Sequence, residues 1–571
     1  MKAKKVLGNL IAIVLLTLVA AGSFGAYMLL TLYEPDVEFG FAANDEKNVP
    51  IYVVKDGALT EAGRVVRGAR IKNYADRERI DGVMYIKLIN GYELLTGPMS
   101  VKTEEAEADK NEAYYMKPRN STLSKTDIVQ EKEAYVRTPV TIYENASGPE
   151  IASFAAKGTK LEITGYDRML GDGSIYKYKV AYGESKEGAK LEGYVYSRYL
   201  ARTQEQADAV YNKVYDNVKN DKYDMELYGG KTSSLDYYPR ERVAFNNNEF
   251  CSDARTMYIN GTAAIKPGNY VKLIKETDCN AVVIDIKDGY LTYKSDVAKE
   301  MSPSSYETAY ASVKDFKKGV DAYKKTGAYL IGRIVVFNDP IYAKDHPEDC
   351  IKYGGDAGWP SAFSRNVWEY NVKLALEAAK LFGFNEIQFD YVRFPESSYE
   401  MSQSGKANFR NAYDEEKGQA VQNFCIYAAD MLHDNGVYMS VDVFGESAYG
   451  YMTAYGQYWP GIANVVDAIS AMPYTDHMGG DGTWEKPYET MLTWSKKAKK
   501  QQDKIENPAA ARTWITGYNT PHWNPTLDYG DKELKAQVKA LEKAGLTGGF
   551  IPWNAASDIG KYRQYKAVWN N

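Results

Sequence analysis

The 571-residue sequence is poor in the residues that bind metals and has no excess of positive charge. It contains four cysteines and four histidines, without a CxxC or HExxH motif, so we expect no metal and no cofactor. The cysteines are widely spaced, which leaves disulfides possible outside the cytoplasm but shows no small-domain framework. The formal net charge of -6 gives no reason to expect a nucleic-acid partner.

Tyrosine is the abundant residue, with 49 copies against 17 phenylalanines and 9 tryptophans. Flat amphipathic rings stack on sugar faces, so this composition favours a carbohydrate ligand. A tyrosine-rich extracellular protein without such a ligand is equally compatible with it. The length of the chain predicts roughly three or four domains.

The N-terminal segment 1–37 predicts a membrane anchor. Lys2, Lys4 and Lys5 precede an apolar run at 6–33 that exceeds the roughly 20 residues needed to cross a bilayer. Lysines before the run and acids after it predict a cytoplasmic N-terminus and a single-pass protein in the cell membrane, with most of the chain outside. The alternative is a signal peptide cleaved near 20–22, which would release a secreted protein.

Two β-rich segments, 48–100 and 131–202, look like copies of one another and predict small barrels. The second ends in GYVYSRYL, which resembles the last strand of bacterial SH3-like domains, and these often bind cell-wall material. A spacer function is equally compatible. The polar stretch 101–130 predicts a linker, and 203–252 predicts a helical connector.

Residues 253–571 alternate between expected strands and helices, which favours a (β/α)8 TIM barrel. A doubly wound open sheet is the alternative, but no glycine-rich phosphate loop follows any strand. The expected strands are 256–260, 281–287, 329–337, 386–394, 437–444, 468–472, 513–518 and 549–553.

The stretch EIQFDYVRFP (386–395) places an acid on an apolar strand. Ile387 and Phe389 share one face, while Gln388 and Asp390 lie on the other. A carboxylate on a buried face is costly unless it is paired or used. Asp390 is therefore a candidate catalytic residue, with a structural salt bridge to Arg393 or Arg333 as the alternative.

The carboxyl ends of barrel strands carry the active site in such folds. Cleavage of a glycosidic bond needs one protonated and one ionised carboxyl group. We expect Asp390 to be the ionised group and Glu446, after the fifth strand, to be the proton donor. Asp442 lies on the lumen side of that strand and competes with Glu446, which could instead cap the following helix. The candidate substrate-binding residues at the strand ends are Asp285, Arg333, Tyr391, Arg393, Tyr474, His477, Tyr518 and Trp553.

Four segments carry a family resemblance: 332–340, 367–395, 441–447 and 548–557. They resemble a bacterial family of glycoside-hydrolase-like domains, long catalogued as a domain of unknown function and related to the (β/α)8 glycosidases. By similarity to the alpha-amylase-type barrels, Asp390 would be the nucleophile and Glu446 the proton donor. The amylases keep a third acid at the end of strand seven, where this chain has Tyr518 and Asn519.

These observations predict a membrane-anchored, extracytoplasmic glycoside hydrolase whose partner is a polysaccharide or cell-wall glycan. The alternative is a non-catalytic glycan-binding or envelope scaffold protein that keeps the barrel without its chemistry. Both hypotheses place glycan binding at the carboxyl end of the barrel. Only the presence or absence of bond cleavage there can distinguish the enzyme from the binding protein.

Overall fold

The computed structural model describes parts of 39–102 and most of 133–570. Within the first stretch it omits 44–47, 56–57, 67–69, 73–76, 81–82, 89–93 and 97–99, and within the second 169–174, 187, 220, 222–227, 355 and 481. The predicted anchor (1–37) and nearly all of the predicted linker (101–130) lie outside the described residues.

The predicted fold class needs one correction, because it included a transmembrane helix. A search of the described residues finds no helix that is both long and apolar enough to cross a bilayer. The barrel in the same prediction agrees with the observed strands.

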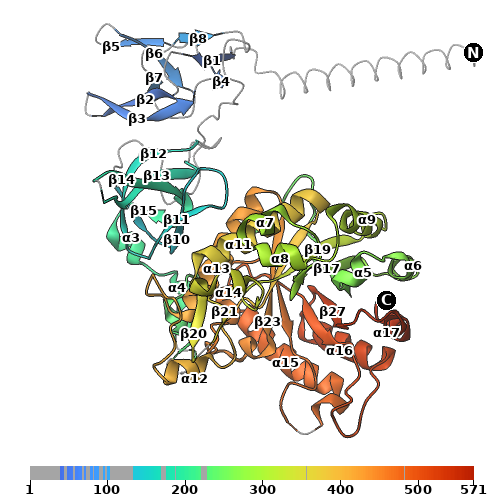
Figure 1. The fold of residues 1–571 in the computed structure, drawn as a ribbon. Helices are drawn as coiled ribbons and strands as arrows, with labels where there is room; N and C mark the ends of the chain where they lie inside the picture. Colours follow the sequence, from blue (N-terminus) through green and yellow to red (C-terminus); the bar gives the residue numbers. More distant parts are fainter. Residues whose placement is uncertain are drawn as a thin grey trace, which may run out of the picture. The chain divides into compact units, whose positions relative to one another are not determined.

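The chain divides into two compact units, Met1–Arg137 with Gly158–Ala207, and Thr138–Lys157 with Asp208–Asn571. The strands described in the first unit form antiparallel sheets ordered β4-β1-β8, β3-β2-β7-β6-β5 and β14-β13-β12-β9-β15 (Figure 1). Their β-rich character fits the sequence expectation, while the SH3-like assignment and the domain boundaries stay predictions. The strands are β1 (Phe39–Ala43), β2 (Asn48–Lys55), β3 (Ala58–Val66), β4 (Arg70–Lys72), β5 (Arg77–Ile80), β6 (Val83–Leu88), β7 (Leu94–Thr96), β8 (Ser100–Lys102), β9 (Glu133–Val136), β12 (Lys160–Tyr166), β13 (Lys177–Glu184), β14 (Lys190–Tyr196) and β15 (Leu200–Ala201).

The second unit is built on a parallel barrel in which each strand pairs with its neighbours in the same direction. β25 pairs with β24 and β26 pairs with β27, and only Arg512 separates β25 from β26, so this segment brings the two edges of the sheet together. The barrel strands are β16 (Ala254–Ile259), β17 (Ala281–Asp288), β19 (Tyr329–Val335), β22 (Glu386–Asp390), β23 (Tyr438–Phe444), β24 (Ala468–Met472), β25 (Ala510–Ala511), β26 (Thr513–Thr516) and β27 (Gly549–Trp553).

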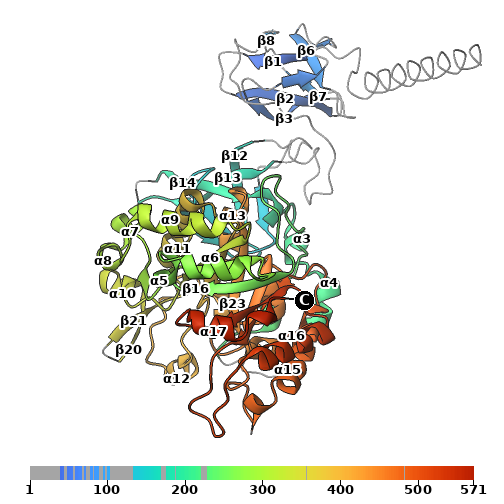
Figure 2. The same cartoon turned by 90° about the vertical axis from the view of Figure 1, so that its right-hand side faces the viewer.

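Helices surround the barrel strands of the second unit, as Figures 1 and 2 show. The long ones follow local capping signals: α13 starts with a capping box between Glu416 and Gln419, and α11 ends at Gly383 in the left-handed conformation. Ser312 caps the helix that begins at Val313, because its side chain accepts the backbone N–H of Asp315. The main barrel helices are α6 (Gly268–Lys275), α9 (Val313–Lys324), α11 (Arg365–Phe382), α13 (Lys417–Asp434), α15 (Pro487–Gln502) and α16 (Asp531–Ala544).

Shorter elements fill the connections. The described part of the predicted connector 203–252 contains two short α-helices, α3 (Gln204–Asp208) and α4 (Asn212–Val218), and a 3-10 helix at Thr232–Ser234. The others are β10 (Val140–Tyr143), β11 (Ile151–Ala155), α5 (Gly261–Ala264), β18 (Tyr290–Leu291), α7 (Asp296–Met301), α8 (Pro303–Thr308), α10 (Tyr342–Asp345), β20 (Cys350–Tyr353), β21 (Asp356–Pro360), α12 (Ser398–Gln403), α14 (Trp459–Ala463) and α17 (Ile559–Gln564).

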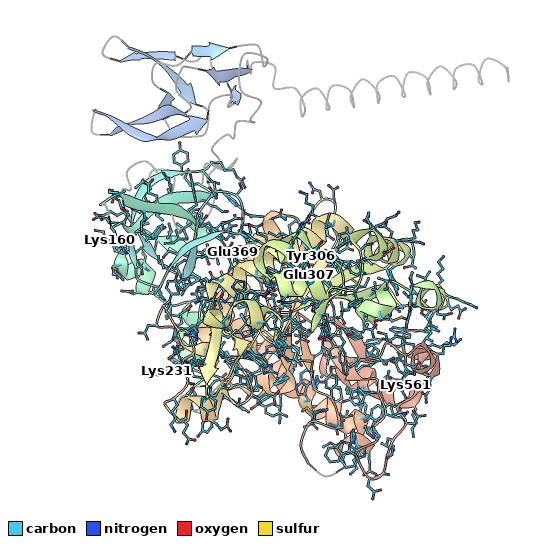
Figure 3. All side chains as sticks on the ribbon, viewed as in Figure 1. Lys160, Lys231, Tyr306, Glu307, Glu369 and Lys561 are labelled. Carbon is cyan, nitrogen blue, oxygen red and sulfur yellow. The ribbon has the colours of Figure 1, made fainter. Side chains whose placement is uncertain are left out.

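The hairpin of β10 and β11 packs on the outer helices of the same unit. The backbone N–H of Ile151 donates at 3.1 Å to Glu369 of α11, which is labelled in Figure 3. Tyr427 of α13 donates to the Pro149 carbonyl at 2.6 Å. These contacts stabilise the outside of the barrel and leave its carboxyl end to the strand-following loops.

The lumen of the barrel is filled by large side chains that point inward from alternating strand positions. The central cluster consists of Tyr258, Val283, Ile331, Trp514 and Ile551. Burial of such rings and branched chains stabilises the fold by about 1.5–3 kcal/mol for each side chain. All four cysteines are free thiols.

Candidate active site

Arg333, at the carboxyl end of β19, lies at the centre of a group of carboxylates, of which three are buried and Asp288 is 45 % exposed. One terminal nitrogen is 2.8 Å from Asp285 and 3.3 Å from Asp288, and the other is 2.6 Å from Asp390. The Nε atom is 3.6 Å from Oδ2 of Asp442. The Arg333 side chain is only 3 % exposed, so these interactions are largely shielded from water.

The parallel register of the strands explains this grouping. Asp285 of β17 is the direct neighbour of Arg333 on β19. Phe389 of β22 pairs with Val441 of β23, so Asp390 and Asp442, the next residue on each strand, come side by side. The cluster therefore forms where four neighbouring strands end, as expected for a TIM-barrel active site.

The electrostatics of the cluster favour protonation of one acid. Burial and then the charge of Asp390 raise the pKa of Asp442 well above its ordinary value. Burial also raises the pKa of Asp285 to about 6, against the opposing effect of Arg333. Burial opposes the charge of Arg333, but Asp285 and Asp390 outweigh it and raise the pKa of the guanidinium. The single positive charge of Arg333 therefore cannot neutralise all the carboxyl groups around it.

Hydrogen bonds hold the carboxylates in defined orientations. Trp514 Nε1 donates to Oδ1 of Asp442 at 2.8 Å, and the Tyr258 hydroxyl donates to Asp285. The backbone N–H of Tyr391 donates to Oδ1 of Asp390 at 2.6 Å. Within the described residues Oδ2 of Asp442 is buried without a hydrogen-bond partner, so a proton there has no protein acceptor.

Tyr391 marks the point where the fourth strand ends. Its φ of 53° lies in the left-handed region, which is unfavourable for a residue with a Cβ. This turn ends β22 at Asp390, four residues before the expected end at 394. Strain of this kind is concentrated at functional sites, which is consistent with the position of Tyr391 beside Asp390.

Glu446, the acid that was expected to pair with Asp390, has other partners. It is half-buried in the turn after β23 and accepts hydrogen bonds from Tyr451 and, at 2.7 Å, from Tyr455. The place beside Asp390 and Arg333 belongs to Asp442. The structure therefore groups Asp390 with the competing acid of the sequence prediction rather than with Glu446.

Arg393 lies in a cage of aromatic rings. Its Cζ atom is 4.4 Å from the ring centre of Phe444, 4.9 Å from that of Tyr391 and 5.4 Å from that of Trp359. Arg333, not Arg393, makes the ion pair with Asp390. Trp359 was not predicted as a site residue, because it lies on the β20–β21 hairpin, outside every predicted strand end.

A second polar group follows β24 and β26. Asp476 accepts a hydrogen bond from Tyr518 at 2.6 Å and lies 2.9 Å from Nδ1 of His477, which raises the pKa of that imidazole. The Tyr474 ring centre lies 5.8 Å from that of Tyr518. These four side chains form an aromatic and polar group. Sequence analysis had placed Tyr474, His477 and Tyr518 at the strand ends.

Trp553 and Tyr258 line the cluster from the first and last strands. The half-buried Trp553 ring packs on Tyr258 at 4.8 Å, and both ring centres are 5.8 Å from Cζ of Arg333. Tyr258 was not predicted, although its lumen parity on the first expected strand could have identified it.

The residues best placed for a metal lie elsewhere. Ligand atoms of His346, Glu348 and Asp349 come within 4.8 Å of one another. The Asp349 carboxylate, however, already accepts hydrogen bonds from Ser364 at 2.7 Å and Tyr342 at 3.0 Å. Because these donors already occupy the Asp349 carboxylate, we interpret the group as structural and as separate from the Arg333 cluster.

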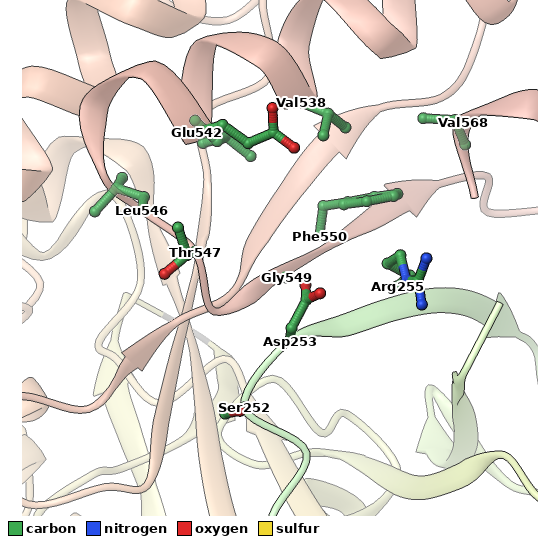
Figure 4. A pocket seen from close by; sticks show the side chains of 11 residues that line it. Ser252, Asp253, Arg255, Val538, Glu542, Leu546, Thr547, Gly549, Phe550 and Val568 are labelled. Carbon is green, nitrogen blue, oxygen red and sulfur yellow. The ribbon is translucent and has the colours of Figure 1, made fainter. Parts of the chain in front are cut away.

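The cavity drawn in Figure 4 lies at the amino ends of the strands, opposite the cluster. Arg255 and Asp253 face Val538 and Glu542 of α16 across a space of about 400 Å³. Because parallel-barrel enzymes use the carboxyl ends of their strands, this cavity is not the candidate active site.

Comparisons with known proteins place the barrel in a family. A family model described as "Putative glycosyl hydrolase domain" matches residues 256–559. No curated protein matches the chain.

Solved structures also match parts of the chain. A hypothetical protein from Ruminiclostridium thermocellum ATCC 27405 is 29 % identical, over 33 % of this chain and 97 % of its own, with a TM-score of 0.27. The glycoside hydrolase domain of PgaB (BpsB) from Bordetella bronchiseptica is 12 % identical, over 56 % of this chain and 99 % of its own, with a TM-score of 0.41. A class V chitinase from Pseudomonas fluorescens Pf-5 is 13 % identical, over 55 % and 98 %, with a TM-score of 0.37. Because the family model spans more than half of the 571 residues, the chain belongs to this putative glycosyl hydrolase family.

Proposed function

We propose that the chain hydrolyses glycosidic bonds at the carboxyl end of its barrel, with Asp390 as the ionised carboxylate and Asp442 as the protonated one. The observation that carries this proposal is the unequal charge of the cluster, in which Arg333 alone faces four carboxyl groups. Two neighbouring acids whose environments separate their pKa values are the usual arrangement for acid and base roles.

The proposed chemistry follows from the positions of the two acids. Asp442 passes its proton to the glycosidic oxygen as the bond to the anomeric carbon breaks, once the entering glycan has uncovered the buried Oδ2. Asp390, held by Arg333 and the Tyr391 N–H, stabilises the positive charge that develops on the sugar ring. Water then supplies the hydroxyl of the product and returns a proton to the acid pair.

The surrounding side chains support binding of a glycan. Tyr474, Tyr518 and Trp553 offer rings for sugar faces, and His477 with Asp476 offers hydrogen-bonding groups. Tyr391 and Arg393 extend this surface beside Asp390. A polysaccharide or cell-wall glycan is accordingly the proposed partner.

The test compares the full chain with three isosteric variants, Asp390→Asn, Asp442→Asn and Glu446→Gln. Reducing ends released from peptidoglycan, glycol chitin, xylan and 4-nitrophenyl glycosides are measured. We expect turnover by the unchanged protein, and large losses for the two aspartate variants only. A loss confined to Asp390→Asn and Glu446→Gln would instead identify Glu446 as the proton donor.

The alternative function, a glycan-binding scaffold, has its own signature in the same assay. It requires binding to at least one polymer without turnover of any substrate by the unchanged protein. Location outside the cytoplasm also stays a proposal, and protease accessibility of the barrel in intact cells would test it.

A further inference from the structure

The four most exposed aromatic side chains among the described residues all lie at the carboxyl end of the barrel. Tyr290 and Tyr310 lie between β17 and β19, Tyr353 between β19 and β22, and Trp523 between β26 and β27. Exposed rings leave apolar surface in water, so their restriction to one end of the barrel indicates a surface for a ligand.

Trp523 is held against a second indole ring. It is 42 % exposed, yet it stacks on Trp484 with ring centres 4.6 Å apart and an angle of 26°. Trp484 is buried and donates from Nε1 to the Pro525 carbonyl at 2.9 Å. One face of the Trp523 indole is therefore held by a buried ring, while much of its surface stays open to solvent. Such preorganisation lowers the entropic cost of binding.

Two tyrosine rings and the backbone that follows β26 lead from the carboxylates to Trp523. Tyr474 packs against the buried cluster that contains Trp514, whose Nε1 donates to Asp442. The Tyr474 ring lies against Tyr518, which follows β26 directly. Two residues further along, the carbonyl of Thr520 accepts the backbone N–H of Trp523 at 3.2 Å.

We propose that Trp523 is a sugar-binding platform at the outer end of this path, and that the ligand is a glycan chain of several sugar units. A single sugar or a disaccharide would leave the platform unused. The inference rests on the proposed function for the nature of the ligand, but not for its hydrolysis.

Binding to polymers tests this inference separately from hydrolysis. The full chain carrying Asp390→Asn is compared with and without Trp523→Ala, by affinity electrophoresis in glycol chitin or xylan and by sedimentation with peptidoglycan. We expect at least one polymer to bind, and Trp523→Ala to weaken that binding about tenfold. Trp523→Phe should restore most of it, because a ring can still stack.

The matched control is Leu381→Ala, which removes an exposed apolar side chain from the outer helix α11. It should bind as the parent does, and introduced alone into the unchanged protein it should not alter turnover of 4-nitrophenyl glycosides. Polymer binding unchanged by Trp523→Ala, or absent from the parent for every polymer, would overturn the inference. Polymer binding through Trp523 without turnover would leave it standing and contradict the proposed function.

Discussion

The barrel lumen contains two buried arginines with opposite consequences. Arg512, between β25 and β26, pairs with Glu386 at 2.6 Å, and both side chains are 0 % exposed. Arg333, at the carboxyl end, faces Asp285, Asp288 and Asp390 together with Asp442. The first centre is balanced in charge, while the second has an excess of acid.

Hydrogen bonds also satisfy the carboxylate of the balanced centre. Glu386 accepts from Tyr329 at 3.1 Å, and Arg512 donates to the Cys251 carbonyl at 3.1 Å. The Nε atoms of Arg512 and Arg333 both lack hydrogen-bond partners among the described residues, but only the Arg333 centre also leaves a carboxylate oxygen, Oδ2 of Asp442, without one. A buried ion pair is thus not by itself a sign of catalysis. Unequal charge and an unsatisfied carboxylate oxygen distinguish the candidate active site from the structural pair.

The largest effect should come from Asp390→Asn, which we expect to lower turnover by roughly 10³–10⁴-fold. The fold should persist, because Arg333 keeps three other carboxyl groups as partners. Steady-state rates on the best glycan and thermal unfolding would be measured together. A variant that loses activity only because it unfolds would contradict the assignment.

Glu386→Gln should have the opposite signature. It removes the one carboxylate that pairs with Arg512 among the described residues, and leaving a buried charge unpaired costs about 3–5 kcal/mol. Urea unfolding should report this loss of stability. The control is Asp321→Asn, which breaks the pair with Lys317, whose side chains are 39 % and 49 % exposed respectively, and which should cost less than about 1 kcal/mol. Equal costs for the two variants would remove the distinction between buried and exposed pairs.

Asp442→Asn should change how stability depends on pH. Because burial and Asp390 raise the pKa of Asp442 in the folded state, the fold binds a proton that the unfolded chain releases near pH 4. The unfolding free energy of the unchanged protein should therefore fall as pH rises from about 4 towards the folded-state pKa.

Asp442→Asn has no carboxyl group at this position, so its unfolding free energy does not fall for this reason as the pH rises. The unfolding free energy of the variant relative to that of the unchanged protein should therefore increase between pH 4 and 8. Asp285, whose pKa is raised to about 6, contributes in the same direction in both proteins and largely cancels in the difference. Urea unfolding at several pH values would measure it. A difference that does not change with pH would mean that Asp442 is ionised in the fold.

Glu446→Gln should have the smallest effect on turnover. The amide can still accept a hydrogen bond from Tyr451 or Tyr455, so the change costs about one hydrogen bond, or roughly a threefold to tenfold loss. Kinetics on the best glycan would measure it, with Asp442→Asn as the comparison. A loss near 10³-fold would return Glu446 to the role of proton donor.

Most of the barrel could be predicted because its strands are short apolar runs between turn-forming residues. The strands 468–472 and 549–553 occur as expected, and the one from 281 extends by a single residue to Asp288. Strand ends were less predictable where backbone conformation decides them, as at Tyr391 with its positive φ. Trp359, Trp484 and Trp523 lie outside the expected strands. Their contacts with Arg393 and with one another identify them as residues of the candidate site and its surroundings.

The sequence by itself determined that acids and arginines alternate with apolar residues at the ends of barrel strands. It therefore predicted Asp285, Arg333, Asp390, Asp442 and Glu446 as one neighbourhood. Only the tertiary structure decided which of them meet, because strand register and burial set distances that sequence spacing does not contain. Asp442 and Glu446 are four residues apart, yet one lies beside Arg333 in a dry lumen and the other between two tyrosines in a turn.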